Sequence, residues 1–597
     1  MIKEAIRQQV KKAHFLLVSQ GKLSSASGEL LDTMAISRPK EKSHGDFSVN
    51  IAMILAKPEN MSPRNIASLF EESLTKNEGY FAHIEIAGPG FINLTLSTKA
   101  LALIIPYIVS RGAAYGRIQA KQTRTALVEF VSANPTGGLH LGHARGAFVG
   151  DAIARLLSAA GFAVTKEYYV NDIGNQVEIL ARTIHKRYRE LFGEQVTIES
   201  GEYPGEYVKD IAIALKNFYG DLWLDKPEEE WLFTIGRFGV DYNLALIKRS
   251  LDAAGIAIDH WYSEQTLYEQ GKLDALIMAY DQRHLLYEAD MAKGSDAKVR
   301  REESKAHKYA HMQAGGTYLR TSKFGDEEDR IIKRRDGRFV YLTADLAYHN
   351  EKYARGFDFL VDVFGADHAG HINRIKAGMA ALGHDIKKLH FVVVQMVRLI
   401  KGGKELKFSK RAGQVIGLDD LIDEVGRDVA RFVFLMRSTN AQFDLDIDAV
   451  TKQSSDNPVF YVQYGHARMA TILARAKDEG LVVEPHNFNE EQQALLVLPE
   501  ERDLILRISE LEDLVEESAL ALEPHRLIFF CHELIKTFHS YFTKYRHSEK
   551  MISDDLAKTK ARLAMVVAIK NTIFNALSIL GISAPDYMEL SASTDDG

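Results

Sequence analysis

Hydrophobic and polar positions follow three different patterns along the chain. The first 115 residues open with Ile2, Ile6 and Val10 at the spacing of one helix face, and later contain HIEIAGPGFINLTLS, a strand-like run broken at Gly-Pro-Gly. This pattern predicts a small α+β module. Beyond Leu418 almost every stretch has apolar residues three and four positions apart, as in PHRLIFFCHELIKTFHSYF. We therefore predict a C-terminal helical bundle.

The middle of the chain, residues 116–418, alternates strands and helices. TALVEFV is strand-like, a turn rich in Asn, Pro and Gly follows, and apolar residues then recur on one helix face until Gly161. AVTKEYYV is a second strand-like run, so these segments predict a βαβ unit with parallel strands. The alternation returns in FVYLT, FLVDVF and LHFVVVQ, which bracket helices expected near Asp345 and His371.

An insertion at about 185–325 splits the predicted sheet. It contains the acidic run DKPEEEW and the basic run AKVRREESKAHK, neither with apolar periodicity throughout. We expect both runs to be solvated surface rather than binding sites. The predicted fold is therefore multidomain α/β: an N-terminal α+β module at 1–115, a parallel-sheet domain at 116–418 and an α-helical domain at 419–597.

Composition limits the classes of protein that fit. A chain of 597 residues with 46% hydrophobic content can bury several cores. The N-terminus is charged, and the apolar stretch Leu101–Ser110 is too short for a membrane span, so we expect a soluble, cytoplasmic protein. A single cysteine, Cys531, excludes an intramolecular disulfide and fits a reducing compartment. The net charge of −7 argues against indiscriminate coating of nucleic acid, but local basic patches remain possible.

The segment SANPTGGLHLGHARGAF places two histidines where the first strand gives way to its helix. The nearby glycines let a ligand approach the backbone closely. A helix N-terminus offers free N–H groups and the positive end of the helix dipole, which suits a triphosphate, and His140 and His143 can donate hydrogen bonds to phosphoryl oxygens. Taken alone, the two histidines are equally compatible with helix capping or core packing.

A second segment, KGGKELKFSKRAG, follows the strand LHFVVVQ and carries Lys401, Lys404, Lys407 and Lys410 on a glycine-rich loop. When a carboxylate attacks an α-phosphate, charge spreads over the phosphoryl oxygens, and positive groups that close on it lower the barrier. A basic loop alone is usually solvated surface. The two segments together, each after a strand, favour a nucleotide site.

These two segments resemble the motifs of class I aminoacyl-tRNA synthetases. His140-Leu141-Gly142-His143 is similar to the first nucleotide-binding motif, and Lys407-Phe408-Ser409-Lys410-Arg411 to the second. The second departs from the usual Lys-Met-Ser-Lys-Ser at Phe408 and Arg411, but both lysines remain. Longer strings, VEFVSANPTGGLHLGHARGAFVGD, YLTADLAYH, GADHAGH and DNPVFYVQYGHAR, resemble arginyl-tRNA synthetases in particular, over nearly the whole chain.

The resemblance implies a Rossmann-type catalytic domain that uses ATP to convert L-arginine to arginyl-adenylate and transfers it to the 3′-terminal adenosine of tRNA(Arg). The catalytic residues it implies are His140, His143, Lys407 and Lys410. ATP would contact His140, Gly142, His143, Gly365, Asp367, His368 and Lys410. Mg²⁺ would arrive with ATP, held mainly by phosphates. No structural zinc is expected, because the pairs His368 with His371 and His532 with His539 lack cysteine and an obvious third ligand.

A guanidinium presents five N–H donors in a planar fork and requires acceptors held in a pocket. By resemblance, the arginine site contains Glu129, Ser132, Asn134, Tyr341, Asp345 and His368. Asn134 would hold the amino acid backbone and Asp345 the guanidinium. Without the resemblance, Asp345 is more simply explained as the N-cap of the helix ADLAYHNEKY. A polar pocket of this kind needs no editing domain.

The terminal domains would contact tRNA(Arg). In the family the N-terminal module touches the tRNA near its elbow, and the C-terminal helices bind the anticodon. Candidate stacking groups are Tyr461, Tyr464, Tyr541 and Tyr545, beside Lys544, Arg546 and His547, although core packing explains each tyrosine equally well. The family expectation is a monomer, and activation in this family often requires tRNA.

Three other interpretations remain. A class I synthetase for another amino acid shares both motifs, but the cysteine- and methionine-specific relatives commonly use cysteine-rich zinc sites. Another nucleotidyltransferase of the superfamily is generally shorter and lacks so large a helical domain. A noncatalytic tRNA-binding protein would not need His140, His143, Lys407 and Lys410 intact.

Overall fold

The computed structural model describes residues 2–76, 79–120, 122–289, 315–405, 417–452, 454 and 457–589. The chain divides into two compact units. Unit 1 contains Met1–Ile118, Lys452–Ala521 and Arg526–Gly597, and unit 2 contains Gln119–Thr451 and Leu522–His525. Every residue predicted for ATP or arginine belongs to the sequence of unit 2.

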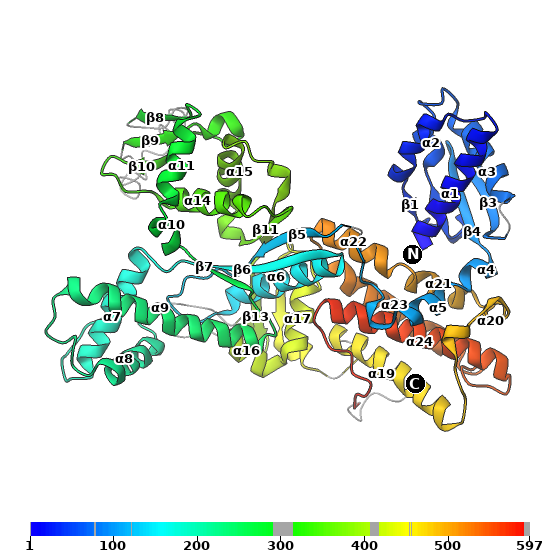
Figure 1. Ribbon diagram of the computed structural model, residues 1–597. Coiled ribbons are helices and arrows are strands. Elements are labelled where there is room, and N and C mark those ends of the chain that lie inside the picture. The colour runs from blue at the N-terminus through cyan, green and yellow to red at the C-terminus, as the bar shows by residue number, and fades with distance from the viewer. Residues whose placement is uncertain are drawn as a thin grey trace. The chain divides into compact units, whose positions relative to one another are not determined.

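A five-stranded parallel sheet forms the centre of unit 2, with strand order β12-β11-β5-β6-β7 (Figure 1). The strands are β5 (Arg124–Glu129), β6 (Phe162–Val170), β7 (His260–Ser263), β11 (Phe359–Gly365) and β12 (Leu389–Val394). The central strands β5 and β11 are buried along most of their length, as expected for a parallel sheet covered on both faces. The strand order reverses between β5 and β11, and ligands bind at the carboxyl ends of strands at such a switch point.

The predicted βαβ unit is confirmed. Helix α6 (Leu141–Ala159) connects β5 to the parallel strand β6, and Gly161 ends the connection at a φ of +89°. Helices α14 (Tyr341–Ala354) and α15 (Ile372–Ala381) lie between the later strands and pack with the sheet in one apolar core. The fold class predicted from the sequence is therefore correct.

Two details differ from the sequence prediction. FVYLT is not a strand: Phe339 forms only an isolated bridge to Lys333, and Tyr341 begins α14. Phe339, Val340 and Tyr341 have the composition of a strand. However, Phe339 and Val340 each pair through the backbone with only one residue of β10, and Val340 is the N-cap of α14. The range 185–325, predicted as an insertion, also contributes the edge strand β7 to the main sheet.

Three helices after β6 form a small bundle with its own apolar core. They are α7 (Asn175–Glu190), α8 (Glu206–Tyr219) and α9 (Glu228–Ala253) (Figure 1). Tyr188, Ile211 and Trp231 belong to this core. Residues 225–230 of DKPEEEW are exposed, as predicted, and the three glutamates begin α9, where the helix dipole favours negative charge; Trp231 at the end of the run is buried instead. The basic run 297–308 lies outside the described residues.

The rest of unit 2 completes the surroundings of the sheet. An antiparallel sheet of β8 (Leu286–Ala289), β9 (Gly316–Leu319) and β10 (Arg330–Arg334) accompanies α10 (Gln265–Glu269) and α11 (Lys272–Asp281). After β12 come β13 (Val397–Lys401), β14 (Lys404–Glu405), α16 (Leu418–Val425), α17 (Arg427–Leu435), β15 (Phe443–Asp446) and α18 (Ile447–Val450). The β13–β14 turn consists of Gly402 and Gly403, both at positive φ, which a tight hairpin requires.

Unit 1 begins with the predicted α+β module. Its antiparallel sheet has the order β1-β2-β4-β3, and the hairpin β3–β4 turns at the Gly-Pro-Gly segment as predicted. The elements are α1 (Ile2–Ser19), β1 (Ile36–Ser37), β2 (Phe47–Val49), α2 (Ile51–Leu55), α3 (Pro63–Thr75), β3 (Phe81–Ala87) and β4 (Phe91–Leu96). Ile2, Ile6 and Val10 are buried on the inner face of α1, as their spacing predicts.

Helices form the remainder of unit 1. They are α4 (Thr98–Leu101), α5 (Ile104–Arg111), α19 (Pro458–Asp478), α20 (Glu490–Ala494), α21 (Pro499–Ile508), α22 (Leu511–Ala521), α23 (His525–Lys544) and α24 (Leu556–Ile579). By length and composition alone α24 could cross a membrane, but 72% of its most apolar window is buried inside the structure, so it is a core helix. Arg562 on α24 pairs with buried Glu501, which also accepts a hydrogen bond from Tyr541. Tyr541 is therefore a core residue and not an exposed stacking group.

Candidate active site

Both histidines of the first motif lie at the N-terminus of α6. His140 is the N-cap: its Nδ1 accepts from the Gly142 amide at 3.1 Å, while its own amide donates to His143 Nδ1 at 3.3 Å. The two rings stack with centroids 3.8 Å apart. Because each Nδ1 accepts a backbone N–H, a neutral ring carries its proton on Nε2. Each neutral ring therefore has its N–H donor at Nε2, and that atom of His140 is buried in the structure.

The chain pairs with this motif at Gly417 and Leu418, just after the lysine segment. Lys407, Phe408, Lys410 and Arg411 lie outside the described residues. On the far side of that gap, Gly417 forms an isolated antiparallel bridge with His140, and the Leu418 amide donates to the Leu139 carbonyl at 3.0 Å. The chain that leaves the lysine segment therefore pairs directly with the histidine segment.

The other two lysines of the segment belong to the β13–β14 hairpin. Lys401 forms an ion pair with Glu424 on α16, which raises the pKa of Lys401 through the shared hydrogen bond. Lys404 is exposed on β14. The first part of the predicted loop is thus an ordered hairpin, in which Lys401 already has a partner.

The turn that follows β5 has an unusual backbone. Val131 and Ser132 both have positive φ, +69° and +40°, a region that non-glycine residues seldom adopt. Ser132 Oγ donates to Glu129 Oε1 at 2.8 Å and accepts from the Tyr169 amide at 3.1 Å. Asn134 Nδ2 donates to Gln176 Oε1 on α7 at 2.8 Å. The predicted arginine ligands Glu129, Ser132 and Asn134 are therefore together at the carboxyl end of β5.

A buried ion cluster lies where β5 and β11 meet. The ammonium of Lys352 on α14, which is fully buried, contacts Glu129 and Asp362, and His349 Nε2 lies 2.9 Å from Asp362 Oδ2. Burial disfavours the charge of Asp362, but Lys352 and His349 outweigh burial and hold the pKa of Asp362 below its usual range. Burial raises the pKa of Glu129, and Lys352 offsets only part of this.

Asp345 lies inside α14, one turn after Tyr341, and is not its N-cap, which is Val340. The two residues share one helix face. Burial raises the pKa of Asp345 well above its usual range, and the neighbouring carboxylates Glu264 and Glu129 raise it further. The ring nearest to Asp345 among the turn histidines is His371, whose Nδ1 is 3.9 Å from Asp345 Oδ2. Burial lowers the pKa of His371, so this ring is neutral near pH 7.

Glu264, which the sequence did not indicate, lies near Asp345 and raises its pKa. It follows β7, its side chain is 6% exposed, and burial together with nearby Asp172 raises its pKa to about 7. Asp172 accepts hydrogen bonds from Ser263 Oγ at 2.6 Å and from the Gln265 amide at 3.1 Å, which fixes the residues on both sides of Glu264. Only the pairing of β7 with β6 brings Glu264 here, so no local sequence signal marks it.

These carboxyl groups surround the hydroxyl of Tyr169. Glu264, Asp345 and Glu129 all act on Tyr169 and raise its pKa, after burial, which is the largest cause. Within the described part of the chain, no Lys or Arg forms an ion pair with Asp345 or Glu264. Buried carboxyl groups without a cation are costly when ionised. The arrangement therefore favours a cationic guest that brings several N–H donors.

The turn after β11 lies at the neighbouring strand end. Gly365, Asp367 and His368 belong to or precede the short 3₁₀ helix Ala366–His371. The side chains of Asp367 and His368 are exposed and 3.5 Å apart, between Asp367 Oδ2 and His368 Nε2. A Cβ on Gly365 would lie 2.6 Å from Asp367 Oδ1, so a larger residue here would displace the exposed Asp367 side chain.

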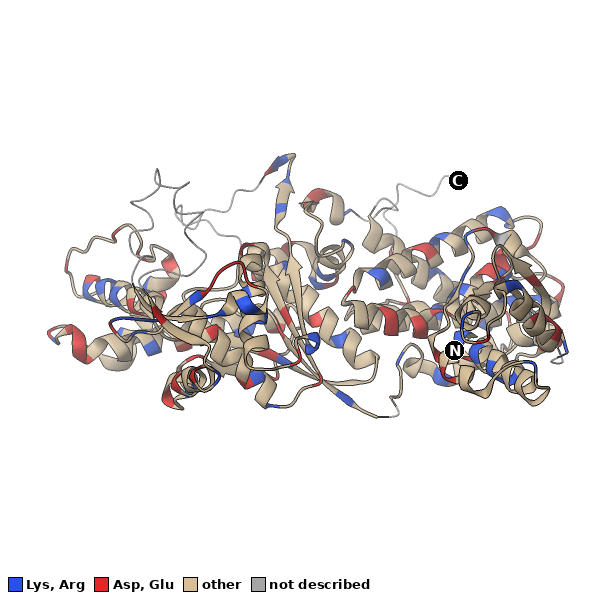
Figure 2. Ribbon diagram, turned by 90° about the horizontal axis from the view of Figure 1, so that it is seen from above, with Lys and Arg blue, Asp and Glu red and all other residues tan. Residues whose placement is uncertain are grey.

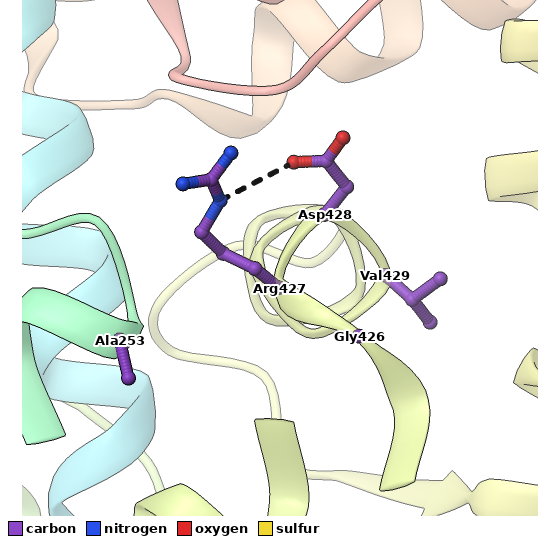
Figure 3. Close-up of a pocket in the computed structure, with 5 residues that line it drawn as sticks. All are labelled: Ala253, Gly426, Arg427, Asp428 and Val429. Carbon is purple, nitrogen blue, oxygen red and sulfur yellow. Dashed lines mark ion pairs between the residues drawn. The ribbon is translucent and has the colours of Figure 1, made fainter. Parts of the chain in front are cut away.

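A cavity of unit 2 lies elsewhere and shares none of these residues. It has a volume of about 350 Å³ and is lined by Ala253, Gly426, Arg427, Asp428 and Val429 (Figure 3). Arg427 and Asp428 point toward each other across it, with Arg427 Nε and Asp428 Oδ1 3.8 Å apart. Basic and acidic residues are otherwise interspersed along the ribbon (Figure 2).

Comparison with known proteins identifies the family. Family models described as "Arginyl tRNA synthetase N terminal domain", "tRNA synthetases class I (R), catalytic domain" and "DALR anticodon binding domain" match residues 1–96, 104–206 with 295–455, and 462–588. An "Arginine--tRNA ligase" of Anaeromyxobacter sp. (strain Fw109-5) is 43% identical over 607 residues, which cover 100% of this chain and 99% of the relative. The chain belongs to the arginyl-tRNA synthetase family.

One further relative agrees with this assignment, and one solved structure agrees with the fold. An "Arginine--tRNA ligase" of Geobacillus thermodenitrificans is 39% identical, over 98% of this chain and 99% of its own length. The solved structure of Thermus thermophilus arginyl-tRNA synthetase superposes with a TM-score of 0.71 at 20% identity, covering 98% of this chain and 100% of the other, and supports the fold. The catalytic-domain model leaves 207–294 unmatched, and both Glu264 and strand β7 lie there.

Proposed function

We propose that this protein ligates arginine to tRNA(Arg) at the expense of ATP. The observation that carries the proposal is a pair of carboxyl groups with raised pKa values, part-buried Asp345 and buried Glu264, neither of which has an ion pair with a Lys or Arg of the described residues. A guanidinium brings one positive charge and five N–H donors in a plane, so it satisfies both groups at once. Tyr341, whose hydroxyl neighbours the same carboxylates, would close the pocket.

The amino acid backbone would bind at the turn after β5. Asn134 offers an amide that now contacts Gln176, and Ser132 holds the Glu129 carboxylate in place. Glu129 would also face the guanidinium. Its ion pair with Lys352 would limit the negative charge that Glu129 adds to that of Asp345 and Glu264. In this arrangement the carboxylate of arginine is directed toward the histidine motif at the start of α6.

Activation would occur at the N-terminus of α6. An arginine carboxylate oxygen forms a bond to the α-phosphorus of ATP, the bond from that phosphorus to the bridging oxygen breaks, and pyrophosphate leaves. His140 and His143 would donate from Nε2 to phosphoryl oxygens, and Lys407 and Lys410 would follow the charge that develops on pyrophosphate. The bridge between His140 and Gly417 is the observation that favours a role of the lysine segment at this site.

ATP would also contact Gly142 and, at the neighbouring strand end, Gly365, Asp367 and His368. Mg²⁺ is typically bound by one or two carboxylates together with phosphate oxygens and water, and the exposed carboxylate of Asp367 could be such a ligand. Mg²⁺ would therefore enter with ATP and neutralise charge on the phosphates. His368 would contact ATP and also lie near the arginine, because its ring is 6.0 Å from that of His371, which lies at Asp345.

The second step joins the amino acid to tRNA. A ribose hydroxyl of the terminal adenosine attacks the carbonyl carbon of arginyl-adenylate and loses its proton, and AMP leaves. The N-terminal module would touch the tRNA near its elbow, and the C-terminal helices would bind the anticodon. Tyr461, Tyr464 and Tyr545 remain candidates for stacking. We further propose a cytoplasmic monomer.

Charging assays test the proposal. Purified protein is offered total tRNA, ATP and Mg²⁺ with each labelled amino acid in turn, and pyrophosphate exchange is measured with and without tRNA. Charging of arginine alone supports the proposal. Charging of a different amino acid would overturn the pocket assignment, and absence of both charging and exchange would favour a noncatalytic tRNA-binding protein.

A further inference from the structure

The turn between β5 and α6, residues 130–138, carries Ser132 and Asn134 but has little regular backbone structure of its own. Its internal hydrogen bonds are short-range, from the Ser132 amide to the Phe130 carbonyl and from the Thr136 amide to the Asn134 carbonyl. Two residues, Val131 and Ser132, have positive φ. Strained backbone of this kind persists only where its surroundings determine it.

Three side chains from different elements donate hydrogen bonds to backbone carbonyls of this turn. Tyr168 on β6 donates to the Ala133 carbonyl at 2.9 Å. The other two donors belong to the helical bundle after β6: Asn243 on α9 donates to the Pro135 carbonyl at 3.1 Å, and Tyr207 on α8 donates to the Thr136 carbonyl at 2.6 Å. With Gln176 of α7, each helix of the bundle contacts the turn.

Tyr168 and Asn243 are buried and Tyr207 is partly buried, which makes all three donors effective constraints. Asn243 is fully buried, so its amide has no water to exchange for the Pro135 carbonyl. The Tyr207 ring lies against Gly137, where an added Cβ would be 3.5 Å from the hydroxyl. The turn is therefore fixed in position by helices α8 and α9, which lie wholly or almost wholly outside the ranges matched by the catalytic-domain model.

We propose that Tyr207 and Asn243 are positioning residues, through which the α7–α9 bundle sets the placement of Asn134 and Ser132 for arginine. This inference rests on the proposed function and deepens it. It gives the bundle a role in amino acid binding that is separate from its contribution to stability. The expected consequence of loosening the turn is weaker arginine binding, with ATP affected less because His140 and His143 are held by their own backbone bonds.

Tyr207→Phe removes one hydroxyl and keeps the ring. Its matched control is Tyr188→Phe, because Tyr188 belongs to the core of the same bundle and donates to the Gly220 carbonyl at the same distance, 2.6 Å, away from the turn. In charging assays with the full-length protein we expect Tyr207→Phe to raise the KM for arginine by about 3- to 10-fold, the usual value of one hydrogen bond. The KM for ATP should change less than about 2-fold.

The Tyr188 hydroxyl also accepts from the Trp223 amide at 3.4 Å, so Tyr188→Phe should lower the thermal midpoint at least as much as Tyr207→Phe while leaving the KM for arginine unchanged. The proposal is overturned if Tyr207→Phe keeps the wild-type KM for arginine, or if both variants raise it equally. Asn243→Asp, which sets a carboxylate against the Pro135 carbonyl, should raise the KM further in whatever fraction folds. Wild-type protein that charges no arginine would instead contradict the proposed function itself, so the two failures are distinguishable.

Discussion

Arginine binding to the carboxylate pocket should tighten as the pH rises from 6 to 8. Burial and Asp172 raise the pKa of Glu264 to about 7, from an ordinary value of 4.5. A carboxyl group with a raised folded-state pKa costs nothing below its unfolded pKa and destabilises the fold increasingly as the pH rises toward 7. A guanidinium favours the ionised form, so binding releases the proton that the empty pocket retains.

The size of this effect follows from the pKa. Glu264 is ionised in about one molecule in ten at pH 6 and in about nine in ten at pH 8, so the Kd for arginine should fall about 10-fold over this range. Asp345 acts in the same direction, because its pKa is also raised. His371 contributes little, since its pKa is lowered and it is neutral over most of the range.

Calorimetric titration of arginine in two buffers with different ionisation enthalpies measures both quantities. At pH 7 about half a proton should leave Glu264 for each arginine bound, and Glu264→Gln should remove this share of the release and weaken the pH dependence, leaving the part that comes from Asp345. The variant should also bind arginine more weakly at pH 8. A Kd that does not change between pH 6 and pH 8, with equal enthalpies in both buffers, would refute the reasoning.

Three further predictions concern stability and catalysis. Lys352→Met should lower the unfolding free energy of unit 2 by about 3–5 kcal/mol, because it leaves Glu129 and Asp362 without their cation. Denaturation should show a larger loss at pH 8 than at pH 6, since these carboxyl groups can take up protons at the lower pH. A loss below about 1 kcal/mol would contradict this prediction. Lys410→Ala should keep the thermal midpoint and slow pyrophosphate exchange about 100-fold; an unchanged rate would exclude its role. Arg562→Leu should destabilise unit 1 by about 3–5 kcal/mol while exchange by the folded fraction persists; an unchanged midpoint would show that its buried ion pair is dispensable.

The spacing of apolar residues and glycines along the chain was sufficient to predict the βαβ unit, because its elements follow one another directly in sequence. The βαβ unit has strand-like runs, a helical face and a terminating glycine within about fifty residues, and the structure contains all of them. The position of His140 and His143 at a helix start follows from the same pattern.

Long-range pairing explains what the sequence did not indicate. Glu264 lies in the predicted insertion, and its importance depends on β7 pairing with β6, about ninety residues earlier in the chain. Lys352 resembles a surface lysine in HNEKY, but Glu129 and Asp362 on two neighbouring strands bury and neutralise it. Tyr341 follows residues of strand composition and nevertheless begins a helix.

The most direct test of the account compares arginine with citrulline, which has nearly the same shape but carries a neutral urea group in place of the guanidinium. If Asp345 and Glu264 select a cation, equilibrium titration at pH 8 should show citrulline binding at least about 100-fold more weakly than arginine, because two buried carboxylates would then face a neutral partner. Equal affinity for arginine and citrulline would contradict the assignment of these carboxyl groups to the guanidinium.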